Sequence, residues 1–382
     1  MTPHALPSRL WRAPGRWFWL GVWAAVFGAS LWQYRGTLGA GFEGYDPGIG
    51  AHDSRMVLRL AREPTPVPYF ARTFSPAGAF YRPGSVVWYW TLCRLLGDRP
   101  TAWRVFALAT HAAAATLLAI LLSMIAGSRA PGVLAAGWFV WRGEHWEVIT
   151  WLAAQVDTAM AALCLAALVA LWREQWNWRW RVAGSSLLAL MALLTKESAV
   201  AVLAFIAVTA PLWPISRGPR ARALALGAFG LAGAIYLAAR VAALGALTPA
   251  PQTALQPPMG ANLHAYLHLA WPPAAWIRAF PPLSLGWMIL LVTPFWKFLF
   301  DHAVYYGGAV LLLWRAWRPT ALFALWILLT PLPALPSLIM GSRYEYLASM
   351  GWAALAGLLI WQSGQMAVRF ARARRGRALA SA

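Results

Sequence analysis

Charged side chains are scarce in this sequence, and acidic ones are the scarcest. Only 12% of the 382 residues are charged, with 12 Asp and Glu against 32 Lys and Arg. Soluble domains carry roughly 25% charged residues, so this composition excludes an ordinary soluble protein. Cysteine is rare too. Cys93 and Cys164 both lie in apolar surroundings, which indicates neither a disulfide framework nor a zinc site.

Apolar residues are abundant instead, at 60% of the chain. Runs near the ~20 residues that a helix needs to cross a bilayer recur along the whole length. These runs are solid rather than alternately apolar and polar, which argues against a β-barrel. The sequence therefore predicts an all-α fold, a polytopic integral membrane protein with about ten transmembrane helices plus interfacial helices.

The net charge of +20 raises the question of a nucleic-acid partner. The arginines stand mainly in short connections and at the tail, where membrane proteins carry them on the cytoplasmic side. No soluble basic domain remains to hold DNA or RNA, so nucleic acid is excluded as a partner. Many of the 26 Trp lie beside Arg or Pro at the ends of apolar runs, which is typical of the membrane–water interface.

The first apolar run, residues 17–32, follows three arginines. It is long for a signal peptide and lacks a clear cleavage site, so it is predicted to be a retained span with a cytoplasmic N-terminus. Further spans are expected near residues 102–126, 131–142, 153–172, 182–195, 198–214, 223–245, 319–335 and 347–363. Arg-rich connections alternate between them, which places residues 142–152 and 195–197 on the outer side.

A single membrane-embedded domain is predicted over residues 1–363, followed by a basic cytoplasmic tail at 364–382. Residues 35–83 are expected to form an external loop because they are too polar and too rich in Pro to span. Residues 246–282, also rich in Pro, are expected to form a second external segment.

Three shorter stretches have their own expectations. Residues 52–62 alternate Arg with Met and Leu, which predicts a short amphipathic helix on the membrane surface. Residues 84–96 are apolar but short, so they are read as an interfacial or partly inserted helix. Residues 283–315 stay open between one long helix broken at Pro294 and an interfacial helix followed by a span.

Ionisable residues in or near apolar runs are informative because each costs free energy unless it is paired or faces a cavity. Four clusters qualify, and the predicted topology puts all of them on the outer side. They are Glu43, Asp46, His52 and Asp53; Glu144, His145 and Glu147 with Asp157; Lys196 and Glu197; and Arg343, Tyr344 and Glu345. Their convergence on one face predicts a functional site there.

Structural alternatives stay open for these residues. Lys196 and Glu197 could form an ion pair at a helix turn, and Arg343 could anchor a helix at the interface. His145 is better explained as a hydrogen-bonded structural histidine than as a metal ligand. Asp46 precedes a proline and could be a turn former.

The residues demand no cofactor and no metal. His264 and His268 have helical spacing, but no third ligand stands at a fitting distance in the sequence. The acidic first loop still leaves a divalent metal open.

Five stretches resemble, in order, motifs of the tetratricopeptide-linked transmembrane glycosyltransferases and their bacterial relatives. The first two are Phe42-Glu43-Gly44-Tyr45-Asp46-Pro47, similar to F-x-x-Y-D-D-P, and Tyr81-Arg82-Pro83, similar to Y-R-P-L. The third runs from His145 through Glu147 and Trp151 to Asp157 and is similar to H-x-E-x-x-x-W followed by a later D. The last two are Leu193-Leu194-Thr195-Lys196-Glu197-Ser198, similar to L-L-S-K-E-[ST], and Arg343-Tyr344-Glu345-Tyr346-Leu347, similar to R-Y-x-Y-L-P. The resemblance covers residues 42–347.

The resemblance implies a GT-C-like fold and an inverting glycosyltransferase in a membrane, with a bacterial inner membrane as the expected location. Such enzymes take sugar from a polyprenyl-phosphate carrier and pass it, on the outer face, to a hydroxyl of a glycan, lipid or protein. Asp46 would be the general base. Because this sequence has one aspartate where the family has two, Asp53 is the second candidate.

The remaining motif residues are expected to bind substrate. Arg343 and Lys196 are candidates for the leaving phosphate, with Arg82 a weaker one, because Arg and Lys stabilise the charge that develops there. His145, Glu147 and Asp157 would orient the substrate or the loop, and Glu197 and Tyr344 complete the set. No tetratricopeptide repeats follow the last span, so a repeat-bound protein partner is not expected.

Two functions from other classes compete with this hypothesis. One is a transporter of lipid or a small solute, although the polar residues gather at one face rather than the midplane and no inverted repeat is visible. The other is a catalytically inactive scaffold of an envelope complex, which the missing second aspartate keeps open.

Overall fold

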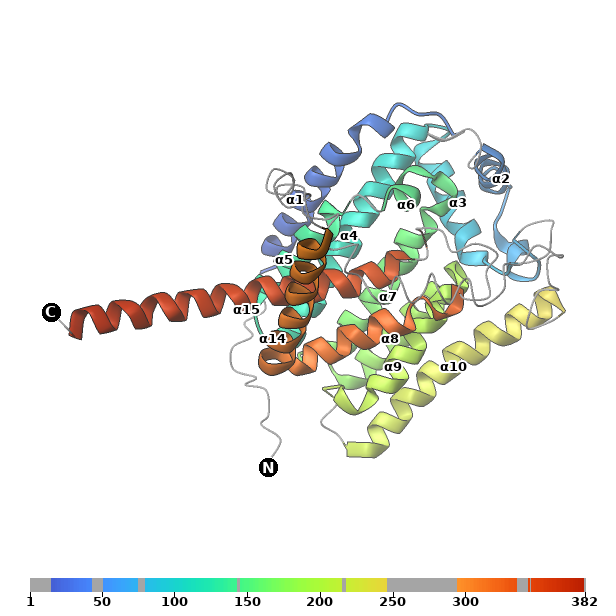
Figure 1. The fold of residues 1–382 in the computed structure, drawn as a ribbon. Coiled ribbons are helices and arrows are strands. Elements are labelled where there is room, and N and C mark those ends of the chain that lie inside the picture. The colour runs from blue at the N-terminus through green and yellow to red at the C-terminus, as the bar shows by residue number, and fades with distance from the viewer. Residues whose placement is uncertain are drawn as a thin grey trace.

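The computed structural model describes residues 15–42, 51–74, 80–142, 145–214, 218–245, 294–334, 343 and 345–380. Within these ranges the regular structure is entirely helical (Figure 1). The α-helices are α1 Arg16–Tyr34, α2 Ala51–Ala61, α3 Pro83–Leu96, α4 Pro100–Ala126, α5 Arg129–Trp141, α6 Trp146–Thr150, α7 Val156–Trp172, α8 Trp178–Thr195, α9 Val200–Thr209, α10 Gly218–Leu244, α14 Pro294–Leu329 and α15 Glu345–Ala380. The 3-10 turns are η1 Arg35–Thr37, η2 Val67–Phe70, η4 Leu152–Ala154, η5 Glu197–Ala199, η6 Ala210–Leu212 and η8 Leu332–Ala334.

Four helical stretches are long and apolar enough to cross a membrane, in agreement with the predicted membrane protein. They are Pro100–Ala126, Leu152–Trp172, Gly218–Leu244 and Gly307–Leu329. The prediction of an all-α fold is confirmed for the described residues, while the count of about ten spans stays a prediction.

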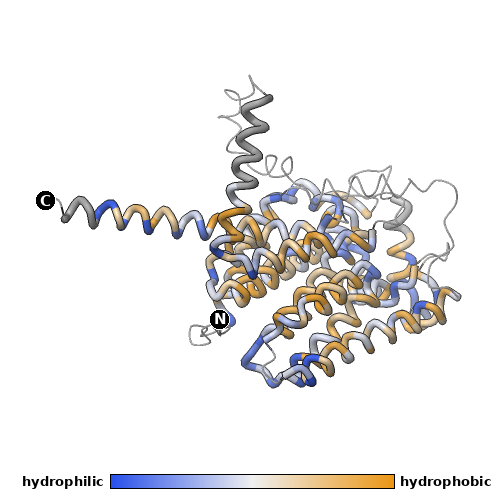
Figure 2. Tube along the Cα trace, turned by 60° about the horizontal axis from the view of Figure 1, so that its bottom comes forward, coloured by the Kyte–Doolittle hydropathy of each residue, from blue (hydrophilic) through white to orange (hydrophobic). Residues whose placement is uncertain are grey.

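Most of the helical trace is coloured as hydrophobic in Figure 2, in outer helices as well as inner ones. On α10, Leu224 is 61% exposed and Leu231 is 62% exposed, and Trp314 of α14 is 69% exposed. Large exposed apolar side chains on these helices are compatible with contact with lipid or another apolar partner.

Helix α4 lies at the centre of the bundle, between α1, α5 and α7. Its inward positions are small, with Ala112, Ala115 and Ala119 each fully buried. Small side chains allow neighbouring backbones to approach closely, which is how helices pack tightly in a membrane. Because small residues keep the helices around α4 close together, side chains from the ends of several helices can reach one another.

Two glycines carry this close packing on the α5 side of α4. A Cβ on Gly132 of α5 would lie 2.2 Å from Ala119 O of α4, and one on Gly357 of α15 would lie 2.4 Å from Pro131 O of α5. Helices α4, α5 and α15 therefore touch backbone to backbone. Gly137, also on α5, has open space around its Cα.

Helix α14 begins at Pro294, within the stretch 283–315 whose two predicted arrangements stay open. Its backbone leaves helical geometry at Ala316, with φ −145° and ψ 43°. Pro319 is three residues further on, and its ring and missing N–H disturb the preceding helical turn. Residues 283–293, part of the same prediction, lie outside the described residues.

The amphipathic helix predicted at residues 52–62 exists as α2, but its apolar side faces protein. Val57 is fully buried and Leu60 is 6% exposed, in a cluster with Tyr89 and Leu152. The expectation that this helix lies on the membrane surface is therefore corrected, because its buried side packs on α3 and η4. Residues 84–96 form α3, and the second external segment at 246–282 lies outside the described residues.

The close packing of α5 yields a stability prediction with an internal control. Gly132→Ala should lower stability by about 1–3 kcal/mol, because the new methyl group collides with the α4 backbone. Gly137→Ala should raise it by up to ~1 kcal/mol, because alanine favours a helix where space is open. Thermal unfolding of both variants in detergent gives the comparison, and equal shifts would contradict the described packing.

Candidate functional site

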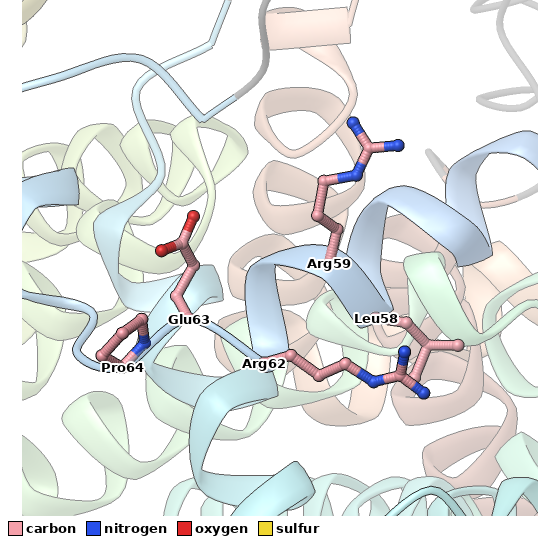
Figure 3. Close-up of a pocket in the computed structure, with 5 residues that line it drawn as sticks. All are labelled: Leu58, Arg59, Arg62, Glu63 and Pro64. Carbon is pink, nitrogen blue, oxygen red and sulfur yellow. The ribbon is translucent and has the colours of Figure 1, made fainter.

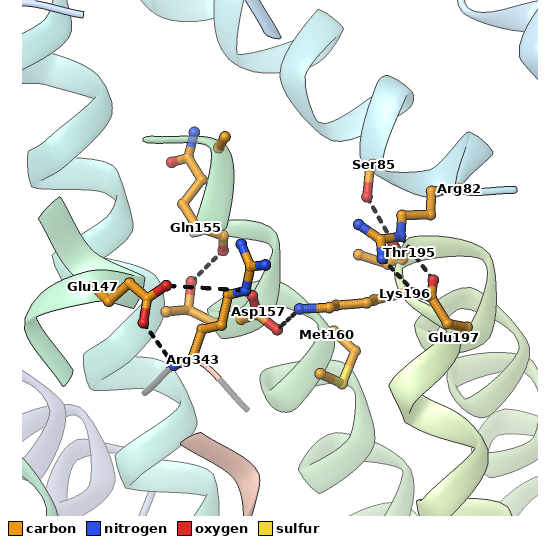
Figure 4. A network of polar contacts seen from close by, with 12 residues as sticks. Arg82, Ser85, Glu147, Gln155, Asp157, Met160, Thr195, Lys196, Glu197 and Arg343 are labelled. Carbon is orange, nitrogen blue, oxygen red and sulfur yellow. Dashed lines mark hydrogen bonds and ion pairs between the residues drawn. The ribbon is translucent and has the colours of Figure 1, made fainter. Parts of the chain in front are cut away.

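Six of the residues singled out in the sequence lie together where several helices end (Figure 4). They form three pairs of opposite charge, each between two different helical elements. The pairs are Arg82 with Glu197, Lys196 with Asp157, and Arg343 with Glu147. We call these six residues the ion-pair network.

The central pair joins α7 to the end of α8. Lys196 Nζ donates a hydrogen bond to Asp157 Oδ1, and the two side chains are only 5% and 4% exposed. Lys196 follows the last residue of α8 in an extended conformation, while Asp157 lies in the first turn of α7, where a helix favours a negative charge. Two adjacent antiparallel helices thus present opposite charges to each other.

The second pair joins the start of α3 to η5. Arg82 Nε donates to Glu197 Oε2 over 2.7 Å, and Arg82 Nη2 donates to the other carboxylate oxygen, which makes the contact bidentate. The guanidinium also lies 4.2 Å from the centroid of the Phe80 ring. Lys196 and Glu197 were open to interpretation as a local ion pair, but each is bound by a partner from another element, Asp157 for Lys196 and Arg82 for Glu197.

The charge of Glu197 follows from this contact. Burial acts to raise the pKa of Glu197, but the adjacent Arg82 guanidinium, together with the Lys196 charge and a backbone hydrogen bond, outweighs burial and lowers the pKa to about 2. An unperturbed glutamate has a pKa of about 4.3. The stabilisation from this pair is therefore complete above that value and is lost as the pH falls towards 2.

A close approach of α3 to α8 places Arg82 beside Glu197. A Cβ on Gly84 would lie 2.8 Å from Thr195 N, and Ser85 Oγ donates to Thr195 O over 2.6 Å. A larger side chain than that of Gly84 would separate the two helices.

The third pair closes the site from the start of α15. Arg343 N donates to Glu147 Oε2 over 3.0 Å, and Arg343 Nε lies 3.9 Å from Glu147 Oε1. The guanidinium lies 4.8 Å from the centroid of the Trp151 ring, close enough for a cation–π contact. Residues almost two hundred positions apart therefore meet at one point.

His145 lies in a cluster of aromatic rings instead of an ion pair. Its ring centroid is 4.4 Å from Phe139, 5.5 Å from His111 and 5.1 Å from Tyr346, and His111 Nδ1 is hydrogen-bonded to Tyr346 Oη at 2.7 Å. Burial lowers the pKa of His145, with smaller contributions from His111 and Arg142, so the ring is neutral at pH 7. This agrees with a structural histidine, the alternative left open from the sequence.

The proposed bases cannot be placed against this network. Asp46 and Tyr344 lie outside the described residues. The backbone of Asp53 belongs to α2, but its side chain is outside the description. Their assignments therefore stay predictions.

Arg104, which the sequence motifs did not single out, binds the chain a few residues before Asp46. Its side chain is 1% exposed, and its two terminal nitrogens donate to Ala40 O and Gly41 O, the latter over 2.7 Å. Phe42 packs edge-on against Trp103. An arginine inside the apolar run 102–126 was the available signal, because a charge there must find partners.

No group of three or more potential metal ligands is found among the described residues. A hollow of about 450 Å³ opens at the end of α2, lined by Leu58, Arg59, Arg62, Glu63 and Pro64 (Figure 3). Arg62 is paired there with Asp98, and both side chains are largely exposed. None of the lining residues belongs to the ion-pair network.

The ion-pair network has three cations and three carboxylates, so its formal charges cancel. An anion that enters the network can bind one of the cations in two ways. It either shares the cation with the carboxylate partner or displaces that carboxylate. Arginine suits such exchange because its five donors are more than one carboxylate occupies. No protein-family model, curated protein or solved structure matches the chain.

The buried Lys196–Asp157 pair leads to a prediction about the free energy of unfolding. Lys196→Met should destabilise the protein by about 3–5 kcal/mol, because it leaves the Asp157 carboxylate buried without its partner. Lys196→Met with Asp157→Leu should recover most of that loss, since the double variant buries no charge. Denaturant unfolding of both single variants and the double variant measures the coupling.

The exposed Arg62–Asp98 pair is the matched control. Asp98→Asn should change stability by no more than ~1 kcal/mol, because water screens a surface pair. Losses of equal size at Asp157 and Asp98 would argue against a desolvated central pair.

Proposed function

We propose that this protein is a membrane glycosyltransferase that moves a sugar from a polyprenyl-phosphate carrier to a hydroxyl on the outer face of a membrane. The observation that carries the proposal is the ion-pair network, in which Arg82, Lys196 and Arg343 gather at one end of the helical bundle. In a lipid-linked sugar the phosphate lies between the apolar chain and the sugar, so it would be bound at the end of the helical bundle, where the apolar helix surfaces stop.

The arrangement of helix ends supports the proposed topology. The network draws on the first turn of α7, the end of α8 and the start of α15, and the predicted alternation of spans gives all three ends the same side. About ten spans, cytoplasmic termini and a bacterial inner membrane complete the proposal. A GT-C-like arrangement of the helices belongs to it as well.

The reaction we propose is a single inverting displacement. The acceptor oxygen forms a bond to the anomeric carbon as the bond from that carbon to the phosphate oxygen breaks. A carboxylate, Asp46 or Asp53, takes the acceptor proton. The phosphate leaves with an added negative charge, which Arg343 and Lys196 stabilise, with Arg82 supporting them.

The carrier chain would lie against the apolar helix surface. Leu224 and Leu231 of α10 illustrate how much such surface is exposed. Burial of the chain supplies binding energy away from the reacting carbon, and this energy can orient the sugar and the acceptor. His145, Glu147 and Asp157 would hold the surrounding structure in position.

A transfer assay tests the function and the base together. Membranes with the wild-type protein should transfer labelled sugar from a polyprenyl-phosphate donor, and loss of the base should reduce the rate at least ~100-fold. We expect this loss in Asp46→Asn or in Asp53→Asn. Asp98→Asn, a change at an exposed aspartate, should keep full activity.

The outcomes separate two errors. Full activity in both the Asp46 and the Asp53 variants would show that the base is elsewhere. Absence of transfer by the wild-type protein from every such donor would refute the enzyme hypothesis.

Labelling of single cysteines tests the topology. In a background without Cys93 and Cys164, Asp98→Cys should react in intact cells with a membrane-impermeant thiol reagent, because the turn before α4 is proposed to face outwards. Gln175→Cys, in the turn before α8, should react only after the membrane is opened. Both native side chains are exposed, so access within the protein is matched. The reverse pattern would invert the topology.

A further inference from the structure

Gln155 is a buried amide whose side chain has no hydrogen-bond partner. It follows η4, directly precedes α7 and is fully buried, and both Oε1 and Nε2 lack a partner. Its backbone is well used, because Gln155 O accepts from Thr158 Oγ1 over 2.7 Å and from Thr158 N over 3.1 Å. The lack of partners is therefore confined to the side chain.

Such an arrangement is unfavourable for the protein alone. An amide side chain can make up to four hydrogen bonds, and leaving it buried without any costs more than the net gain from a usual hydrogen bond. Buried polar groups in native proteins almost always have partners, so each exception needs an explanation. Unfavourable local arrangements of this kind are found at functional sites.

The neighbouring residues share this property. Trp151 Nε1 and His145 Nε2 are also buried without a partner. These groups are neutral, and they lie in the same stretch of chain as Glu147 and Asp157 of the ion-pair network. Figure 4 shows the Gln155 amide pointing away from the Asp157–Lys196 pair. Residues 145–157 therefore carry two kinds of hydrogen-bonding groups, the paired carboxylates of the ion-pair network and neutral groups without a partner.

The chemistry of these groups indicates what Gln155 binds. A phosphate is matched by Arg and Lys, whereas an amide offers a donor and an acceptor side by side without charge. Neighbouring hydroxyl groups on a sugar ring present the complementary pattern. We propose that Gln155 binds hydroxyl groups of the transferred sugar and is a specificity-determining residue, an inference that rests on the proposed glycosyl transfer.

The inference has a signature that a structural role would not produce. Gln155→Met removes the unpartnered amide at similar volume, so the ligand-free protein should become more stable, with a melting temperature higher by about 2 °C or more. Sugar transfer should fall about tenfold or more, because the sugar loses its hydrogen bonds. Stability and activity thus move in opposite directions.

The experiment uses the full-length protein in detergent with polyprenyl-phosphate mannose, glucose and galactose as donors. Melting temperatures are measured without donor, and transfer rates with each donor, for wild type, Gln155→Met and Gln155→Leu. Gln175→Met removes an exposed glutamine and should change neither quantity. Deoxy forms of the best donor are then compared, and wild type and Gln155→Met should have equal rates on the form that lacks the bound hydroxyl.

Other results for the Gln155 variants would contradict the inference. If both Gln155 variants melt below wild type or fail to fold, the amide has a structural role and the inference is wrong. If they transfer at the wild-type rate, or if no deoxy donor equalises the rates, the amide does not bind the sugar, while the proposed function stands. If wild type uses none of the three donors, the inference fails together with transfer from a hexose carrier.

Discussion

The buried contact between Lys196 and Asp157 is the interaction on which the centre of this structure depends. Each charge is removed from water, and each is tolerable only while the other is present. The pair therefore ties the end of α8 to the start of α7. Lys196 is extended between α8 and η5, so the same contact sets where Glu197 lies and which helix can supply its arginine. Gly84 then lets α3 approach closely enough for Arg82 to reach that carboxylate.

Much of the fold could be predicted because it depends on composition and local rules. The length of apolar runs predicts helices, and most observed helices overlap the predicted ranges, as α4 does at 100–126. The break at Ala316 in α14 was not predicted. Pro294 starts the helix, where proline is tolerated, while Pro319 disturbs the turn before it from within the helix. For α2, the amphipathic pattern was recognised, but the pattern does not say whether protein or lipid covers the apolar side.

The site was predictable as a set of residues and much less as a set of contacts. Ionisable residues near apolar runs drew attention to Lys196 and Arg343, because an unpaired charge there is costly. Arg82 was singled out by the resemblance of Tyr81-Arg82-Pro83 to a family motif. The identity of each partner depends on which helices are neighbours, and sequence spacing does not contain that information. Arg104 and Gln155 were missed for a related reason. Their importance lies in what surrounds them, two backbone carbonyls in one case and no partner in the other.

Helix α15 begins at Glu345, two residues after Arg343 of the ion-pair network. It continues without interruption into the basic C-terminal tail, which projects far from the body of the molecule (Figure 1). At about 1.5 Å per residue, its 36 residues extend for about 54 Å, well beyond a bilayer core of about 30 Å. An unbroken helix of this length is stiff, so a rotation of its C-terminal end would displace Tyr346 and the residues around it. The tail is thus mechanically continuous with the candidate site, and a force or a tether acting on one end reaches the other without passing through a loop.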